Sequence, residues 1–223
     1  MTAMPRIALI HATTIAVDPI RQELAASWPD VDAVNILEDS LSPDRAKAAD
    51  ITPELTSRIT ALTHYACSIG SDAVLFTCSA FGTAIEHAAG TVDIPVLKPN
   101  EAMFEAAIEA GGRVAMLYTF PAAGLGMEEE FREQAATMKS TARMDSFLVQ
   151  HAIDAVRVGD AETHNRLVSQ AASKLSGYDA IVLAHFSTAR ALDDVRRVTD
   201  IPVFSSPKAA VQKLRRLVVE GAR

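Results

Sequence analysis

Short runs of apolar residues alternate along the chain with longer stretches in which apolar residues recur every three or four positions. The short runs predict strands and the longer stretches predict amphipathic helices. The expected strands are 6–13, 31–37, 72–78, 94–97, 113–119, 142–149, 179–185 and 201–205. The expected helices include 53–69, 79–89, 101–110, 124–138, 161–175, 188–198 and 208–220. This regular alternation predicts an α/β fold with mostly parallel sheets and helices on both faces.

The two halves of the chain resemble each other at one constant offset, which aligns Arg6 with Arg113. Three pairs of segments match at this repeat offset: 6–10 with 113–117, 70–74 with 177–181, and 93–96 with 200–203. Generic strand–helix periodicity is an alternative source of such matches, but the shared offset favours a duplicated unit. We expect two pseudo-symmetric lobes, each with a mostly parallel four-stranded sheet. Lobe 1 would be 1–99, completed by the C-terminal helix 207–223, and lobe 2 would be 100–206.

The duplication places two reactive side chains at equivalent strand ends. The expected strand 72–78 ends on Cys78, and its counterpart 179–185 ends on His185, which the repeat offset aligns with Cys78. Ligands of parallel sheets bind outside the carboxyl ends of the strands. If a pseudo-twofold axis relates the lobes, the thiol and the imidazole face each other across an active site between the lobes. Two such groups could remove a proton from one face of a carbon and return one to the other.

The segments 74–82 and 181–189, together with the two Ile-Pro-Val strands, resemble the aspartate/glutamate racemase superfamily. This group also contains hydantoin racemases, maleate isomerases and arylmalonate decarboxylases, and the similarity covers essentially the whole chain. The resemblance implies two pseudo-symmetric α/β lobes and chemistry without pyridoxal phosphate or a metal. In the typical racemase each lobe contributes one catalytic cysteine after its third strand. Cys78 matches the first cysteine, whereas His185 occupies the second position.

The sequence also departs from the better-known members of this superfamily. The first strand runs into His11-Ala12-Thr13-Thr14 instead of the Asp-Ser-Gly of glutamate racemases or the Asn-Pro-Asn of hydantoin racemases. Arylmalonate decarboxylases keep the cysteine of the second lobe and lack the first, which is the reverse of the arrangement here. The substrate therefore does not follow from the resemblance.

Both candidate catalytic residues have a plain structural alternative. Cys78 precedes the expected helix 79–89, whose free backbone amides would favour the thiolate, but a free cysteine can also pack as a small apolar side chain. His185 can exchange a proton near neutral pH, or it can orient the substrate or serve a structural hydrogen bond. Cys67 lies within a helical apolar pattern and is expected to pack there.

A carboxylate substrate requires hydrogen-bond donors, and small or hydroxyl residues follow several expected strands. By the resemblance, the carboxylate-binding positions are Ser79, Ala80, Thr119 and the residues after His185, namely Phe186 and Ser187. Thr13 adds a hydroxyl after the first strand, and His11 could bind a carboxylate or tune Cys78. Serine and threonine are also favoured helix N-caps, and both roles can coincide.

Composition excludes several other functions. The 223 residues carry 21 basic and 28 acidic side chains, a net charge of −7, and they form no basic stripe for nucleic acid. No apolar run is long enough to span a membrane, and no dinucleotide-binding glycine pattern is present. The remaining histidines are expected on the surface or in caps, and no residues have metal-ligand spacing; these histidines are His64, His87, His151 and His164.

We therefore predict a cofactor-independent racemase or epimerase that exchanges a proton between Cys78, His185 and a small α-chiral carboxylate. One alternative is a decarboxylase or cis–trans isomerase of a small dicarboxylic acid on the same scaffold. Another is a non-catalytic protein that binds a small acid. The two cysteines and the expected solubility indicate the cytoplasm, with a homodimer or higher homo-oligomer as the expected assembly.

Overall fold

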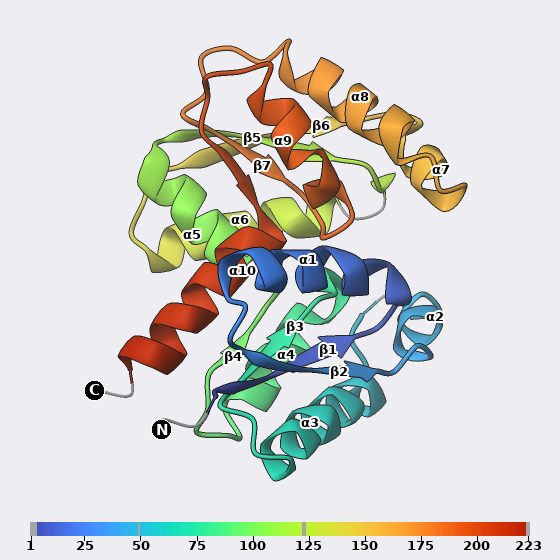
Figure 1. Ribbon diagram of the computed structural model, residues 1–223, viewed down its shortest axis with the longest axis vertical. Helices are drawn as coiled ribbons and strands as arrows, with labels where there is room; N and C mark the ends of the chain where they lie inside the picture. Colours follow the sequence, from blue (N-terminus) through green and yellow to red (C-terminus); the bar gives the residue numbers. More distant parts are fainter. Residues whose placement is uncertain (1–3, 49, 122–123, 222–223) are drawn as a thin grey trace. The chain divides into compact units, whose positions relative to one another are not determined.

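The strands of the computed structural model, which describes residues 4–48, 50–121 and 124–221, form two parallel four-stranded sheets (Figure 1). The chain divides into two compact units, and each unit holds one sheet. The first unit is Met1–Pro99 with Ala210–Arg223, and the second is Asn100–Ala209. An α/β fold with all-parallel sheets flanked by helices is therefore confirmed.

The sheet of the first unit has the strand order β2-β1-β3-β4. Its strands are β1 (Arg6–His11), β2 (Asp32–Leu37), β3 (Ala73–Phe76) and β4 (Val96–Leu97). The helical segments are η1 (Thr14–Ala16), α1 (Val17–Ser27), α2 (Leu41–Arg45), α3 (Pro53–Ser68), η2 (Ser79–Phe81) and α4 (Gly82–Ala89). Figure 1 shows α1 on the opposite side of this sheet from α3.

The sheet of the second unit has the corresponding order β6-β5-β7-β8. Its strands are β5 (Arg113–Tyr118), β6 (Arg143–Leu148), β7 (Ala180–Leu183) and β8 (Val203–Ser205). The helical segments are α5 (Glu101–Ala110), α6 (Gly124–Thr137), α7 (Ala152–Arg157), α8 (Ala161–Ala172), η4 (Thr188–Ala191) and α9 (Leu192–Arg196). Helix α10 (Ser206–Arg215) and the π-helical turn η5 (Arg216–Glu220) follow β8 and end the described chain.

Every expected strand is present, although each is shorter than the apolar run that predicts it. The expected helices are also present, and two of them, 79–89 and 188–198, begin as 3₁₀ turns. Helices α1, α2 and α7 were not among the stretches singled out. Two of these three are only five or six residues long, too short to show a clear helical periodicity.

Backbone hydrogen bonds repeat at the same offset as the sequence. The Asp72 side chain accepts the backbone N–H of Arg6 at 2.7 Å, and the Asp179 side chain accepts that of Arg113 at 2.8 Å. The offset that aligns Arg6 with Arg113 also aligns the first residue of β3 with the first residue of β7. The two sheets therefore repeat in register as well as in strand order.

Glycines at equivalent positions lead into the third strand of each sheet. Gly70 and Gly177 adopt φ angles of 76° and 72°, in the left-handed region that a residue with a Cβ rarely enters. In the first unit this glycine closely follows the end of α3, and it lets the chain turn back to begin β3. This explains why the repeat retains glycine at both positions.

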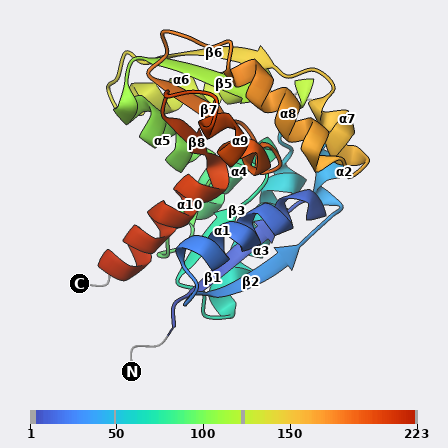
Figure 2. The same cartoon turned by 45° about the horizontal axis from the view of Figure 1, so that its top comes forward.

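The second sheet is covered on both faces because alternate residues of its central strands point to opposite sides. Val114 and Val182 pack with α5 and α6, whereas Leu117 and Leu183 pack with α8 and α9. Figure 2 shows the two pairs of helices on the two sides of this sheet. Among the described residues, no helix has both the length and the apolar character needed to cross a membrane.

Candidate functional site

The candidate residues of each unit gather where its central strands end. In the first unit Ile10 pairs with Phe76, and in the second Leu117 pairs with Leu183. Because these pairings end both ladders, the following residues lie side by side at the carboxyl edge of each sheet. Adjacent strand ends in the first unit are followed by His11, Thr13, Cys78, Ser79 and Ala80, and those in the second unit by Thr119, His185, Phe186 and Ser187.

Cys78 lies two residues beyond β3, in extended backbone directly before the turn η2. Burial raises the pKa of its thiol, and a hydrogen bond from the Ala80 backbone amide opposes that increase. The expectation that backbone amides approach the sulfur is met at Ala80. However, the amides do not lower the pKa below its ordinary value, because the loss of solvent around the sulfur has the larger effect.

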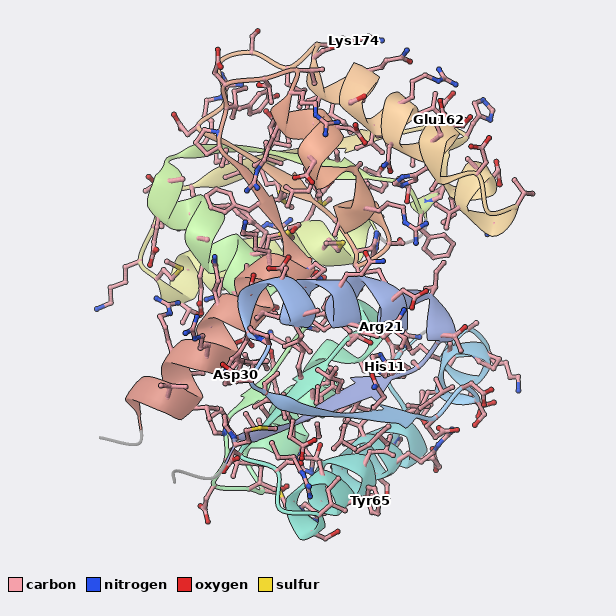
Figure 3. The ribbon with its side chains drawn as sticks, viewed as in Figure 1. His11, Arg21, Asp30, Tyr65, Glu162 and Lys174 are labelled. Carbon is pink, nitrogen blue, oxygen red and sulfur yellow. The ribbon has the colours of Figure 1, made fainter. Side chains whose placement is uncertain are left out.

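The His11 side chain is fully buried among the strands of the first unit (Figure 3). Its Nδ1 lies 2.8 Å from the hydroxyl of Thr77, and its Nε2 lies 2.9 Å from Oδ1 of Asn35. The network therefore connects β1 to β2 and to the residue that precedes Cys78. Burial lowers the pKa of His11, so the ring is neutral at neutral pH.

The hydroxyl of Thr13 serves as the N-cap of η1. It accepts a hydrogen bond from the backbone N–H of Ile15 at 3.3 Å. Ser187 also occupies a cap position, before η4, but its side chain makes no capping bond. Helix capping therefore explains the hydroxyl of Thr13, whereas the hydroxyl of Ser187 makes no capping bond.

His185 combines an unusual backbone with an unpaired side chain. Its φ is 69°, a left-handed conformation, whereas Cys78 at the equivalent position is extended with φ −120°. Both ring nitrogens are buried and have no hydrogen-bond partner among the residues that the structure describes. Burial lowers the pKa of His185 to about 4. The Ala184 main chain lies near enough to oppose this decrease in part, although it makes no hydrogen bond of good geometry to the ring, and the imidazole is neutral at neutral pH. Backbone strain and unsatisfied buried polar atoms of this kind are typical of functional sites.

Two hydroxyl groups next to His185 are also buried without partners. Thr119 is two residues beyond Leu117, just as His185 is two residues beyond the paired Leu183. Within the described part of the chain, the Oγ1 atoms of Thr119 and Thr188 have no hydrogen-bond partner, and both residues are essentially inaccessible to solvent. Thr188 directly follows Ser187, and it belongs to the hydroxyl residues after the strands that are expected to supply donors for a carboxylate. These two hydroxyls and the imidazole of His185 are therefore polar groups whose hydrogen-bonding capacity is unused.

One other histidine corrects an expectation. His164 was predicted on the surface or in a cap, but it is fully buried on α8, and its Nδ1 lies 2.9 Å from Oδ1 of Asn165. Helix α8 places His164 in line with Val168 and Ala172, which are also buried, so its face of the helix is the core face. Within the described ranges, no group of three or more metal-ligating side chains gathers at one place.

Comparisons with known proteins give a family match and solved structures with the same fold. The family model described as Asp/Glu/Hydantoin racemase matches residues 7–176. An allantoin racemase from Klebsiella pneumoniae superposes with a TM-score of 0.73 at 17% identity, over 97% of this chain and 89% of that protein. A glutamate racemase from Bacillus anthracis superposes with a TM-score of 0.71 at 14% identity, over 97% and 83%.

A third solved structure with the same fold is a mutant arylmalonate decarboxylase. It superposes with a TM-score of 0.66 at 19% identity, over 98% of this chain and 95% of that protein. The curated protein sequences provide no significant match. At these identities, the solved structures establish the shared fold, and the family match extends over most of the chain.

Proposed function

Because the chain belongs to the Asp/Glu/hydantoin racemase family, we propose that it is a racemase or epimerase of a small α-chiral carboxylate. Membership in this family supports an isomerase-type enzyme. The observation that carries the proposal is His185, whose strained backbone and unpartnered ring nitrogens lie at the strand end equivalent to that of Cys78. The proposed reaction uses these two residues and no cofactor.

The two side chains have complementary protonation states. Burial raises the pKa of the Cys78 thiol and lowers the pKa of His185 to about 4. At neutral pH the resting protein thus offers one protonated acid and one unprotonated base. A two-base racemase requires one group in each state, because one group removes a proton while the other delivers one.

In the proposed reaction, the neutral imidazole of His185 takes the α-hydrogen as a proton, and the electron pair of the broken C–H bond delocalises into the substrate carboxylate. The Cys78 thiol then delivers its proton to the opposite face, which forms the new C–H bond and leaves a thiolate and an imidazolium. That charged pair performs the reverse conversion, or it returns to the neutral pair by exchanging protons with solvent. The proposal requires both groups to reach one substrate carbon.

The unpaired hydroxyls of Thr119 and Thr188 supply donors for the carboxylate. Deprotonation next to a carboxylate places additional negative charge on its oxygens, so donors fixed in advance lower the barrier. Because both hydroxyls are buried and no described residue pairs with them, a bound carboxylate would satisfy them. We therefore propose that these two residues bind the substrate together with Ser79, Ala80 and Ser187.

The experiment is turnover in D₂O with both enantiomers of aspartate, glutamate and allantoin, and with phenylmalonate as a decarboxylation probe. Racemisation predicts loss of optical rotation with one solvent deuterium at the α-carbon. Substitution C78A is expected to abolish it, while H185N should abolish it or strongly bias one direction. Full turnover by C78A would reject the thiol mechanism.

A decarboxylase is the second candidate, favoured by the similarity to arylmalonate decarboxylase and by the chemical inequality of a thiol and an imidazole. It predicts release of CO₂ from phenylmalonate and one deuterium in the product, without interconversion of enantiomers. A dicarboxylate cis–trans isomerase would interconvert maleate and fumarate instead. A binding protein would do none of these, and C78A would then retain the wild-type affinity for the acid.

A further inference from the structure

In each unit, an arginine binds the backbone carbonyl that lies two residues after the proposed catalytic side chain. Arg45 Nε donates to the carbonyl oxygen of Ala80 at 3.1 Å, in the turn that follows Cys78. Arg190 Nε donates to the carbonyl oxygen of Ser187 at 3.0 Å, in the turn that follows His185. The two carbonyls are equivalent in the repeat, since the repeat offset aligns Ala80 with Ser187.

The two arginines themselves are not equivalent in the repeat. Arg45 ends α2, which precedes β3, whereas Arg190 lies in η4, after β7. The repeat offset would pair Arg190 with Thr83. Simple inheritance from the duplicated ancestor therefore does not explain the shared contact. Equivalent carbonyls are thus bound by guanidinium groups from different places in the two units: one arginine precedes the third strand of its sheet and the other follows it.

The carbonyl that each arginine holds controls the orientation of neighbouring amides. A trans peptide is planar, so fixing a carbonyl also fixes the N–H of the next residue in the opposite direction. In the first turn the held carbonyl directly fixes the N–H of Phe81, and it also restrains the main chain of Ala80, whose own amide contacts the Cys78 sulfur. In the second turn, the Thr188 amide donates to the carbonyl oxygen of His185 at 3.2 Å. Both turns are short 3₁₀ segments, whose internal hydrogen bonds are weak.

Each arginine is in turn anchored to its own unit. Arg45 Nη1 donates to the carbonyl oxygen of Ala48 at 2.6 Å. The side chain of Asn165 donates to the carbonyl oxygen of Arg190 at 3.1 Å and to Asp194 at 2.9 Å. The Arg45 guanidinium and the main chain of Arg190 are thus each held by a second contact within their own unit, which is what a preorganised turn requires.

We propose that Arg45 and Arg190 are positioning residues that fix the turns carrying Cys78 and His185, each within its own unit. Only the expected effect of these two residues on turnover rests on the proposed function. Its structural part concerns the state of the two side chains and can be measured without a substrate.

The test for Arg45 is the pH profile of Cys78 alkylation by iodoacetamide, measured in a C67S background so that only one thiol reacts. In R45M the Ala80 carbonyl loses its anchor, so the main chain of Ala80 is held less firmly and its amide stabilises the thiolate less. We expect the midpoint of the profile to move to higher pH by about 0.5 unit or more. The substitution R45K keeps the charge but lacks the fork that reaches two carbonyls, so it should show a shift in the same direction. It also provides the measurement if R45M does not fold.

The test for Arg190 is an NMR titration of the His185 ring. In R190M or R190K the turn loosens and water gains access to the imidazole. We expect its titration midpoint to rise from about 4 by roughly one unit towards the ordinary histidine value. Each variant also serves as a control for the other, because each arginine acts on its own turn. R45M should not change the titration midpoint of His185, and R190M should not change the alkylation midpoint of Cys78.

Matched controls are R21M in the first unit and R157M in the second. Both arginines are exposed and pair with an aspartate one helical turn away, Arg21 with Asp18 and Arg157 with Asp154 (Arg21 is labelled in Figure 3). The proposal is overturned if R45M and R190M match these controls. It is also overturned if either variant shifts both side chains equally, because that result indicates general loosening.

Turnover separates this inference from the proposed function. Once a substrate is found, R45M and R190M should each lower kcat by about tenfold or more, with a smaller change in KM. If C78A retains activity, the racemase mechanism fails, and the alkylation and NMR results still decide the role of the arginines. If C78A is inactive but the arginine variants titrate like the controls, the positioning role alone fails.

Discussion

The Nδ1 atom of His11 lies 2.8 Å from the hydroxyl of Thr77, which ties the end of β1 to the residue before Cys78. Because Oδ1 of Asn35 lies 2.9 Å from Nε2, that nitrogen carries the ring proton and Nδ1 accepts from Thr77. The backbone amide of Thr77 also donates to the carbonyl of Ile10 at 3.0 Å. The chain just before the proposed catalytic thiol is therefore held through its main chain and its side chain.

This bond predicts the stability of two variants at Thr77. T77V keeps the side-chain volume but leaves Nδ1 of His11 buried without a donor, which should cost about 1–3 kcal/mol of unfolding free energy. T77S keeps the hydroxyl and loses one methyl group, so its cost should be only about 1 kcal/mol. Urea denaturation measures both. A T77V protein at least as stable as T77S would contradict the assigned hydrogen bond.

The buried histidines predict a loss of stability in acid. The pKa of His185 is lowered to about 4 in the folded protein, below the ordinary value near 6.5 that applies when the chain unfolds. Between these values the unfolded chain binds a proton that the folded chain does not, so stability falls as the pH drops from about 6.5 to about 4. The full contribution of His185 is about 3 kcal/mol.

The pH dependence can be assigned by comparing variants. Thermal unfolding midpoints measured from pH 8 to pH 4 should fall less steeply for H185N than for the unmodified protein. Burial also lowers the pKa values of His11 and His164, so part of the acid sensitivity should remain in H185N. The exposed residue His87 provides the control H87Q. Equal slopes for H185N and H87Q would show that His185 is not buried in its neutral form.

The repeated aspartates predict matched losses of stability in the two units. Asp72 and Asp179 each accept the backbone N–H that begins the first strand of their sheet. Both aspartates are exposed, so removing either acceptor should cost about 1 kcal/mol. D72N and D179N retain an oxygen acceptor and should cost less than D72A and D179A. Urea midpoints that rank asparagine below alanine would contradict this role.

The fold could be predicted from the sequence because its signals are local or repeated. The strands that begin at Arg6 and Arg113, and those around Val74 and Ile181, share apolar patterns at one offset, so each half supports the interpretation of the other. The carboxyl ends of parallel strands then locate the candidate residues without any knowledge of side-chain contacts. This reasoning identified Cys78, His185 and Thr119 as neighbours of strand ends.

The state of the site could not be predicted, because it depends on contacts between distant residues. Arg45 reaches Ala80 across 35 positions of sequence, and no periodicity indicates such a bond. The left-handed backbone of His185 and the raised pKa of Cys78 likewise depend on burial in the folded chain. His164 is different, since its helical spacing from Val168 and Ala172 marks a buried helix face in the sequence itself.

The unpaired hydroxyls of Thr119 and Thr188 predict opposite effects on stability and on substrate binding. In the free protein each Oγ1 is buried and unpaired among the described residues, so T119V and T188V remove a polar group that gains nothing from folding. Valine has nearly the same shape, and stability should be unchanged or higher by up to about 1 kcal/mol. If these hydroxyls bind the substrate carboxylate, the same variants lose a hydrogen bond to a charged group, and KM should rise by about tenfold or more.

Thermal unfolding and steady-state kinetics on the same preparations measure both effects. T77V provides the contrast: the hydroxyl of Thr77 is paired with His11 in the free protein, so removing it should lower stability. A fall in stability for T119V and T188V, with KM unchanged, would assign these hydroxyls to the fold and remove them from the substrate site.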